Sequence, residues 1–222
     1  MDRRSFLTGW AKRGVLSAPA DNLSSSHNQP LSTGLEPWVP TTTDQWDEVR
    51  AGHLLRRTMM MPTWSDLAKI VVMTPSDAVD LLMNTPSNPK PIDFTPLGPE
   101  WDSSLGKLDV QLTSQMKAKW AAQDALLKNW FANVLLSSPI SIVEKLTLFW
   151  SGHFTSQFDA SDSYVLAPSL YRQNVLFRNN GLLNFKDLAF YVTLDGAMIV
   201  YLGGDQNFIG KPNENYSREL ME

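Results

Sequence analysis

Residues 139–154 read PISIVEKLTLFWSGHF, and this stretch decides the fold class because it is apolar on nearly every side. Glu144 and Lys145 are the charges within it. A helix that is apolar all round is typical of the centre of a domain. A strand is the alternative for residues 142–150, which include β-branched and aromatic side chains. The length of the run and the absence of glycine from residues 142–150 favour the helix.

Helix signals precede this stretch. Residues 44–60 place apolar side chains at helical spacing. Thr63 and Thr74 each stand before a helical pattern and have an aspartate three residues later, which predicts two N-caps. Pro75 fits the first position of the second of these helices. The sequence therefore predicts two short helices joined by a tight turn.

Helix signals also surround and follow it. An apolar stripe predicts a long helix over about residues 106–138, which Pro139 ends. Pro139 also fits the first position of the next helix. Gly181 is the predicted C-terminal cap of a helix, and Asn184 is the predicted N-cap of another that continues to about residue 202. The fold class is therefore mainly α, a multi-helical single domain with about seven to nine helices.

Composition changes mark the predicted domain boundaries. Residues 1–40 are predicted to form a basic N-terminus and a flexible, disordered arm rich in Ser, Pro, Asn and Thr. Residues 41–222 form the helical domain, which is expected to be cut short at its C-terminal end. Five prolines within residues 85–99 exclude a helix and predict an internal linker that follows the surface. No repeat of 20–50 residues is visible.

The N-terminus resembles an export signal. Arg3 and Arg4 precede Ser-Phe-Leu, as in the twin-arginine motif, and SAPAD offers an A-x-A cleavage pattern. Lys12 and Arg13 interrupt the apolar stretch that such a signal requires. The favoured prediction is export to the periplasm or the exterior. The alternative is a plain basic start on a cytoplasmic protein.

Composition excludes several classes of function. The formal net charge of −4 and the pI near 5.4 argue against a protein that binds duplex nucleic acid. The absence of cysteine excludes disulfides, thiolate metal sites and a cysteine nucleophile. No apolar run is long enough for a transmembrane segment. The partner is therefore an unidentified protein or small molecule.

His153 is the first candidate for chemistry, because it follows the apolar helix and stands among aromatic residues. Its imidazole could ligate a metal or act as a general base. The favoured interpretation is a buried histidine whose ring is satisfied by a carbonyl group.

His53, Arg56 and Arg57 form a second cluster within two helical turns. Paired arginines can bind a carboxylate or a phosphate. The favoured interpretation is an interior ion pair with an acid from another helix, such as Glu214 or Glu219.

The closing stretch GKPNENYSRELME, residues 210–222, is the third cluster and predicts a helix that begins near Asn215. Glu219 and Glu222 would share one face of this helix. Its carboxylates could act as acid and base, or ligate a divalent metal together with His153 and Glu144. The favoured interpretation is that Glu214 and Asn215 satisfy free amides at the helix start.

Four segments together resemble a known family. They are HLLRR at 53–57, EKLTLFWSGHF at 144–154, residues 171–204, and KPNENYSRELME at 211–222. Their order and spacing resemble the bacterial domain-of-unknown-function family 1800 (DUF1800), over about residues 44–222. The family's closing motif, N-E-N-[FY]-x-R-E-L-x-E-L, is matched at the following positions: Asn213, Glu214, Asn215, Arg218, Glu219 and Glu222.

The resemblance implies that this chain corresponds to the N-terminal half of longer proteins, many of which carry export signals. It implies no activity, because the family has no generally accepted reaction. The family's middle motif is usually W-H-x-H-F, and Ser151 stands here in place of the first histidine. If the two histidines form a metal site or an acid–base pair, this copy is weakened or inactive. If they are structural, Ser151 is a mild change.

Two functions remain open at this stage. One is a non-enzymatic, extracytoplasmic module that binds a partner or assists secretion, and this is the favoured prediction. The other is a hydrolase-like or metal-dependent enzyme with a polar pocket around His153 and the NENYSRE segment. Its candidate catalytic residues are His153, Glu214 and Glu219, and its candidate metal ligands are His153, Glu144 and Glu219. The candidate binding residues are His53, Arg56, Arg57, Asn213, Asn215 and Arg218.

Overall fold

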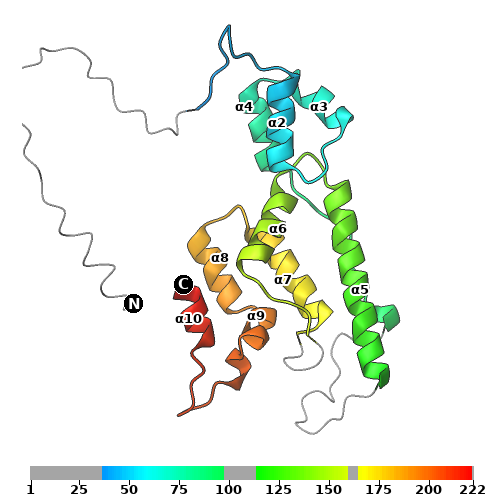
Figure 1. Ribbon diagram of the computed structural model, residues 1–222, viewed down its shortest axis with the longest axis vertical. Helices are drawn as coiled ribbons and strands as arrows, with labels where there is room; N and C mark the ends of the chain where they lie inside the picture. Colours follow the sequence, from blue (N-terminus) through cyan, green and yellow to red (C-terminus); the bar gives the residue numbers. More distant parts are fainter. Residues whose placement is uncertain (1–36, 98–113, 160–164, 222) are drawn as a thin grey trace, which may run out of the picture. The chain divides into compact units, whose positions relative to one another are not determined.

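The computed structural model describes residues 37–97, 114–159 and 165–221 (Figure 1). Within these ranges the chain forms nine α-helices and no strand, which confirms the mainly α fold. The predicted N-terminal arm lies outside the described residues up to residue 36. The helices are α2 (Glu48–Thr58), α3 (Trp64–Ile70), α4 (Pro75–Asn84), α5 (Ser114–Ser137), α6 (Val143–His153), α7 (Ala167–Asn180), α8 (Phe185–Thr193), α9 (Gly196–Tyr201) and α10 (Asn215–Met221).

Side-chain caps mark the starts of α3 and α4. Thr63 accepts a hydrogen bond from the Asp66 amide, and Asp66 accepts one from the Thr63 amide, so α3 begins with a complete capping box. The Thr74 hydroxyl caps α4 by accepting from the Asp77 amide at 3.2 Å, with Pro75 at the first helical position. Both predicted caps are confirmed. The buried faces of α2, α3 and α4 meet in one hydrophobic core, with Leu55, Ile70 and Leu82 among its members.

The segment between α5 and α6 differs from the prediction. Helix α5 ends at Ser137, and α6 begins at Val143 rather than at Pro139. The Ser141 hydroxyl accepts from the Val143 amide at 3.2 Å, and the Ile142 amide donates to the Leu82 carbonyl at 3.1 Å. The Ser141 hydroxyl also donates to the Thr85 carbonyl at 2.5 Å, and the bonds to Leu82 and Thr85 tie residues 141–142 to the end of α4. Helix α6 therefore begins after this segment. The predicted start of α5 near residue 106 lies outside the described residues.

The buried and exposed faces of α6 differ from those expected from its apolar sequence. Its buried residues include Glu144 and Thr147, whereas Phe149 is 56% exposed. The predicted helix is confirmed, but its burial differs from that expected of an apolar helix at the centre of a domain, because Phe149 faces outward. The physical reason is that its inner face carries a charged group with a partner.

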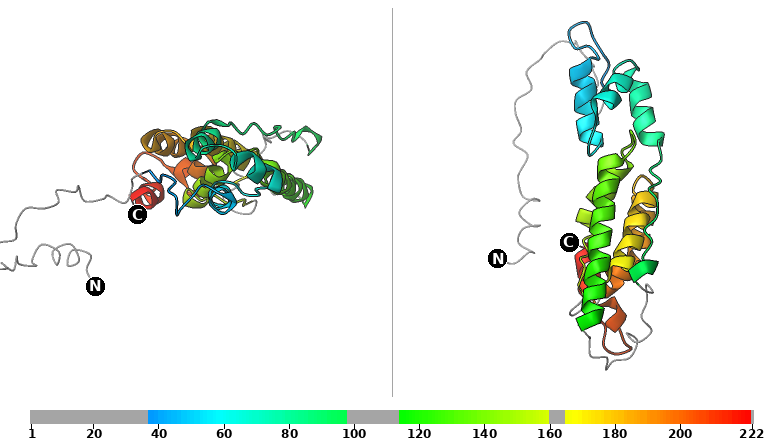
Figure 2. Two further views of the ribbon diagram at one scale, coloured as in Figure 1. Left: turned by 90° about the horizontal axis from the view of Figure 1, so that it is seen from above. Right: turned by 90° about the vertical axis from the view of Figure 1, so that its right-hand side faces the viewer.

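That partner is Arg178 of α7. The Nε and Nη2 atoms of Arg178 donate to the two carboxylate oxygens of Glu144 at 2.6 and 2.9 Å. The Ser87 hydroxyl donates to the same carboxylate, and the Arg178 guanidinium lies 5.3 Å from the centre of the Trp130 ring. The pair thus joins α6, α7, α5 and the segment that follows α4. Figure 2 shows α5 (green) running beside α7 (yellow).

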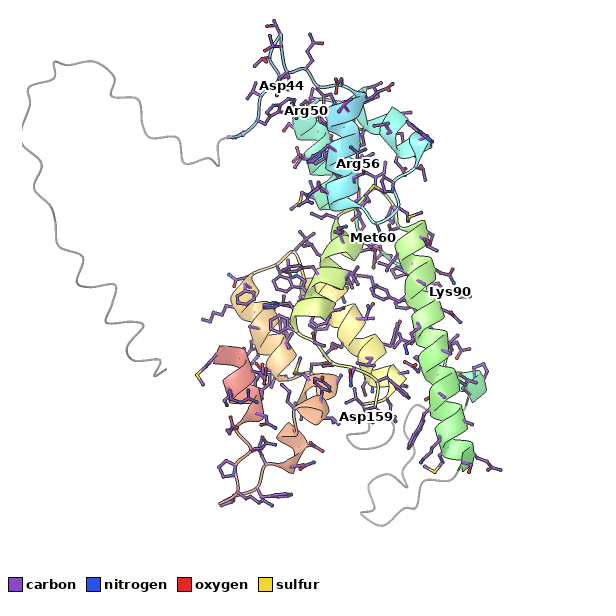
Figure 3. All side chains as sticks on the ribbon, viewed as in Figure 1. Asp44, Arg50, Arg56, Met60, Lys90 and Asp159 are labelled. Atoms are coloured by element: carbon purple, nitrogen blue, oxygen red, sulfur yellow. The ribbon has the colours of Figure 1, made fainter. Side chains whose placement is uncertain are left out.

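The proline-rich segment packs against α5 and α7. Phe94 is 2% exposed and lies beside Leu127 and Ala167. The Trp130 indole donates to the Lys90 carbonyl at 2.8 Å, and Figure 3 labels Lys90 beside α5. A 3-10 turn at Thr95–Leu97 is its only regular structure among the described residues of the predicted linker.

The predicted helix over residues 184–202 is two helices. Asn184 caps α8 as predicted, by accepting from the Lys186 amide at 2.9 Å. Asp195 then ends the run, because its buried carboxylate accepts from the Met198 amide at 3.0 Å and caps α9. The same oxygen accepts from the Gln173 side chain at 2.8 Å. This tertiary bond holds the break between α8 and α9 against α7.

Gly181 is the C-cap of α7, as predicted, with right-handed backbone angles. Its importance is steric, because a Cβ atom there would lie 2.8 Å from Cδ1 of Trp150 and 2.7 Å from the Phe177 carbonyl oxygen. The Trp150 indole donates to the Gly181 carbonyl at 2.9 Å. The close approach of this ring therefore requires glycine.

We expect Gly181→Ala to lower the free energy of unfolding by about 1–3 kcal/mol, because the indole must move. Gly152→Ala is the matched control, since a Cβ at this helical position meets nothing within 4 Å. The control should be neutral or stabilising by up to about 1 kcal/mol. Urea unfolding of both variants measures this difference, and an unchanged stability in Gly181→Ala would contradict the steric account.

Candidate functional site

His153 is the last residue of α6 and is exposed to solvent. Its ring stacks on Phe149, with centroids 6.1 Å apart and planes 3° apart. It also makes T-shaped contacts with Trp150 and Phe154, with centroids 5.8 and 4.8 Å apart. The interpretation of His153 as a buried histidine is therefore wrong, because the end of α6 turns this face outward.

Phe185 of α8 completes a cluster of rings around the histidine. It stacks on Trp150 at 5.8 Å and on Phe154 at 6.3 Å. Phe154 in turn stacks on Phe177 of the core at 6.3 Å, which anchors the cluster. We call Phe149, Trp150, His153, Phe154 and Phe185 the aromatic cluster. Phe149 and Phe185 are more than half exposed, so the cluster presents ring faces to solvent.

A hollow of about 570 Å³ adjoins this cluster, and we call it the His153 hollow. Rings supply much of its wall, and Glu219 supplies a carboxylate. Tyr216 is held in place by a 2.6 Å hydrogen bond between its hydroxyl and that of Thr193. The lining residues are His153, Phe154, Thr155, Phe185, Met198, Tyr201, Leu202, Tyr216, Glu219 and Leu220.

Asn213 positions α10 beside this hollow. Its side-chain amide donates to the Gly203 carbonyl at 3.1 Å, and its side-chain oxygen accepts from the Asn215 amide at 3.0 Å. Gly203 has φ +69, and a Cβ there would lie 2.6 Å from Nδ2 of Asn213. Asn213 therefore provides the helix-start contact that the sequence assigned to Glu214 and Asn215. The Asn213 side chain therefore has a structural role, to which Asn215 contributes its backbone amide.

Arg218 forms ion pairs with Glu214, which precedes α10, and with Glu219 of α10. Its guanidinium lies 3.5 Å from the Glu214 carboxylate and 2.8 Å from that of Glu219. All three side chains are exposed, so these ion pairs contribute little to stability. Glu219 alone of the three lines the His153 hollow. Glu222 lies outside the described residues.

The predicted metal site is not assembled by these residues. Glu144 is 1% exposed and bound to Arg178, so it belongs to the core rather than to the His153 hollow. In the ranges that the structure describes, no three His, Asp or Glu side chains meet in an arrangement that could hold a metal ion. Of the four candidate residues for metal or acid–base chemistry, His153 and Glu219 come together at one hollow.

The His53–Arg56–Arg57 cluster lies elsewhere, on the exposed face of α2 (Figure 3 labels Arg56). The buried face of α2 is Ala51, Gly52 and Leu55, so the arginines point to solvent. The predicted interior ion pair with Glu214 or Glu219 is therefore wrong. The Arg56 guanidinium folds back over Gly52, where a Cβ would lie 3.0 Å from Nη1.

The family model described as "Protein of unknown function (DUF1800)" matches residues 53–222. The chain belongs to the DUF1800 family. The match begins at His53, somewhat later than the start near residue 44 that the resemblance suggested. No curated protein and no solved structure matches this DUF1800 chain. Within the described residues, none of its helices has the length and apolar character needed to cross a bilayer.

The two motif positions 151 and 153 of this DUF1800 chain face different hollows. Residues two apart on a helix lie on nearly opposite faces. The Ser151 hydroxyl donates to the Thr147 carbonyl at 2.8 Å and lines a hollow with Asn174, whereas His153 lines the hollow with Glu219. The geometry therefore favours separate roles for these two positions in this chain.

Asp195 is a buried acid that the sequence did not single out. It lines a third hollow, of about 480 Å³, together with Arg172 and Tyr191. Burial raises the pKa of Asp195 above its ordinary value of 3.8, although bonds from Met198 and Gln173 oppose the rise. The Asp195-Gly196 dipeptide is a turn signal and could have revealed the cap. Its burial depends on Gln173 and could not be predicted locally.

This raised pKa makes stability depend on pH. Between pH 3.8 and the raised value, the folded chain binds more protons at Asp195 than the unfolded chain, so the free energy of unfolding from this group increases as pH falls. Asp195→Asn keeps an oxygen that can accept from Met198 and Gln173 but cannot ionise. We expect the variant to lack the increase in the free energy of unfolding that Asp195 contributes as pH falls. Urea unfolding from about pH 6 to about pH 4 measures this difference. Parallel pH curves for the two proteins would contradict the assignment.

Proposed function

We propose that this DUF1800 chain is a non-enzymatic binding module, and that the aromatic cluster with the His153 hollow is its binding surface. The observation that carries the proposal is the exposure of Phe149 and Phe185 beside a hollow with a carboxylate. Exposed ring faces next to a concave surface are typical of interaction sites rather than of a solvated face.

The chemistry of the wall favours a cationic group. Rings of Phe154, Phe185, Tyr201 and Tyr216 line the hollow, and aromatic rings attract Arg and Lys side chains. Glu219 adds negative charge, and its exposed ion pair with Arg218 is weak enough to exchange. The net charge of −4 also favours a basic partner. The partner is therefore a protein that inserts an arginine or lysine side chain into the hollow.

An enzymatic function is the second candidate, because His153 and Glu219 line the same hollow. In that case the imidazole would act as general base in a hydrolase-like reaction, with Glu219 as the acidic partner. The variant His153→Asn distinguishes the two functions. If the chain is an enzyme, this variant loses turnover of a simple ester such as p-nitrophenyl acetate. If the chain is a binding module, neither the variant nor the unaltered protein turns the ester over.

Export is part of the proposal. The paired Arg3 and Arg4 before Ser-Phe-Leu support a twin-arginine signal, which would place the binding surface outside the cytoplasm. A basic partner or a secreted substrate would then meet the module beyond the membrane.

The binding proposal predicts selective recognition of arginine. Nα-acetyl-arginine amide should cause saturable NMR shifts at residues 153–155, 185 and 216–220. The neutral isostere Nα-acetyl-citrulline amide should not. Glu219→Gln should weaken binding about twofold to fivefold, because an exposed charge pair contributes up to about 1 kcal/mol.

Glu214→Gln is the matched control, since Glu214 also pairs with Arg218 but does not line the hollow. It should bind arginine amide as the unaltered protein does. Equal shifts with arginine and citrulline, or equal losses in both variants, would rule out recognition of a cation at this hollow.

The export proposal predicts that residues 1–30 carry a reporter across the membrane of a cell with an active twin-arginine pathway. Replacing Arg3 and Arg4 by lysine should abolish transport, because the pathway reads the arginine pair. Retention of the unaltered fusion in the cytoplasm would remove the export proposal and leave the binding proposal intact.

A further inference from the structure

A separate hollow, of about 580 Å³, lies between α2, α3 and the turn that joins them. Figure 1 shows the two helices side by side. The volume is within the range of small-molecule sites. We call it the Arg56 hollow, and its wall is apolar except at Arg56 and Thr63. The apolar lining residues are Gly52, Leu55, Pro62, Trp64 and Leu67.

Trp64, the first residue of α3, gives the wall a large aromatic surface. Its side chain is 83% exposed, and Met61 in the preceding turn is 54% exposed. Exposed apolar side chains beside a concave surface are typical of a binding site, and an indole offers a large area for contact. The apolar part of a ligand would therefore pack on Trp64.

The guanidinium of Arg56 lies against this apolar wall. A Cβ on Gly52 would lie 3.0 Å from Nη1 and 3.9 Å from Cζ of Arg56, and 3.9 Å from Cδ1 of Leu67. The charged group and the Leu67 methyl group thus both approach Gly52, which is itself part of the wall. Glycine is unfavourable inside a helix, and at position 52 it makes room for the guanidinium.

Arg56 is the polar side chain of the wall that remains available to a ligand. The Thr63 hydroxyl donates to the Asp66 carboxylate at 2.7 Å and accepts from the Asp66 amide at 3.2 Å, so the cap of α3 uses it. Arg56 forms no ion pair with any residue that the structure describes, whereas Arg50 of the same helix pairs with Asp44. The positive charge at the hollow is therefore left for an anion.

The form of this charge favours a carboxylate. A guanidinium offers two parallel N–H groups, which match the two oxygens of a carboxylate, and one carboxylate balances its single charge. A phosphate monoester would bring about two negative charges. A purely ionic ligand would leave the apolar wall without contacts, and a purely apolar one would leave Arg56 without a partner. The wall therefore fits a molecule that joins one carboxylate to an apolar body.

From these contacts we infer that the Arg56 hollow binds a small carboxylate whose body is aromatic or branched aliphatic. The carboxylate accepts from Arg56, and the body packs on Trp64, Pro62 and Leu67. The inference is independent of the basic partner proposed for the His153 hollow, because the two hollows share no lining residue. Failure of one proposal leaves the other intact.

The test is an NMR titration of the 222-residue chain with indole-3-acetate, phenylacetate and 4-methylpentanoate, each to about 20 mM, since weak sites have dissociation constants of about 1 mM. The corresponding neutral amides and inorganic phosphate are the control ligands. We expect saturable shifts with at least one carboxylate at residues 52–56 and 62–67, including the Trp64 indole N–H. Its amide should bind at least about threefold more weakly, because it lacks the charge that pairs with Arg56.

Arg56→Gln should weaken binding of the carboxylate at least about threefold and leave binding of the amide unchanged. Its folding should be intact, since the side chain is exposed. Arg57→Gln is the matched control, because Arg57 is an exposed arginine of the same helix that does not line the hollow. Both variants lower the net charge equally, so only the position of the charge differs. Trp64→Ala should weaken binding of the carboxylate and of the amide alike.

Four results would overturn the inference. They are the absence of saturable binding by every carboxylate tested, shifts that map outside the Arg56 hollow, equal affinity for a carboxylate and its amide, and equal losses in Arg56→Gln and Arg57→Gln. Phosphate that binds as tightly as the carboxylates would also overturn it, since the apolar wall would then contribute nothing. So would shifts at residues 52–67 that depend on protein concentration without ligand, since a second copy would then fill the hollow.

Discussion

The buried pair between Glu144 and Arg178 is the interaction on which the rest of the domain depends. Both side chains are almost fully enclosed, at 1% and 5% exposure, and the pair is bidentate. Removing two charges from water is costly, and the cost is offset only when the geometry is good and further hydrogen bonds are made. Ser87 supplies a further hydrogen bond, and the Trp130 ring supplies a cation–π contact to Arg178. The pair therefore fixes the rotation of α6 about its own axis.

That rotation decides where the functional candidates lie. With Glu144 and Thr147 inward, Phe149 faces outward, and the end of α6 presents Ser151 and His153 to different hollows. The aromatic cluster is thus a consequence of burying a charge on the opposite side of the same helix. The hollow lined by His153 and the hollow lined by Ser151 therefore both depend on this one orientation of α6.

The sequence predicted the parts of this fold that are fixed over three or four residues. The caps at Thr63, Thr74 and Asn184 were predictable, because each side chain bonds an amide within its own helix start. The partner of Glu144 was not, because Arg178 lies 34 residues away and only the folded chain brings the two together. The cap at Asp195 is local and was overlooked, whereas the burial of its carboxylate was not predictable, because Gln173 of another helix holds it.

The candidate site was predicted in part. His153 and Glu219 do meet at one hollow, whereas Glu144 is committed to the core and Glu214 stands apart. The exposure of His153 and of Arg56 was misjudged, because apolar or paired neighbours in sequence do not determine which face of a helix is covered. Rings from α8, α9 and α10 complete the hollow, and their convergence is a property of tertiary packing.

A double-mutant cycle on Glu144 and Arg178, measured by urea unfolding, tests the central role of this pair most directly. Glu144→Gln and Arg178→Met should each lower the free energy of unfolding by about 3–5 kcal/mol, because each leaves a buried partner uncompensated. The double variant should be less destabilised than the sum by at least about 2 kcal/mol. Additive effects, each within the roughly 1 kcal/mol of an exposed ion pair, would contradict the account.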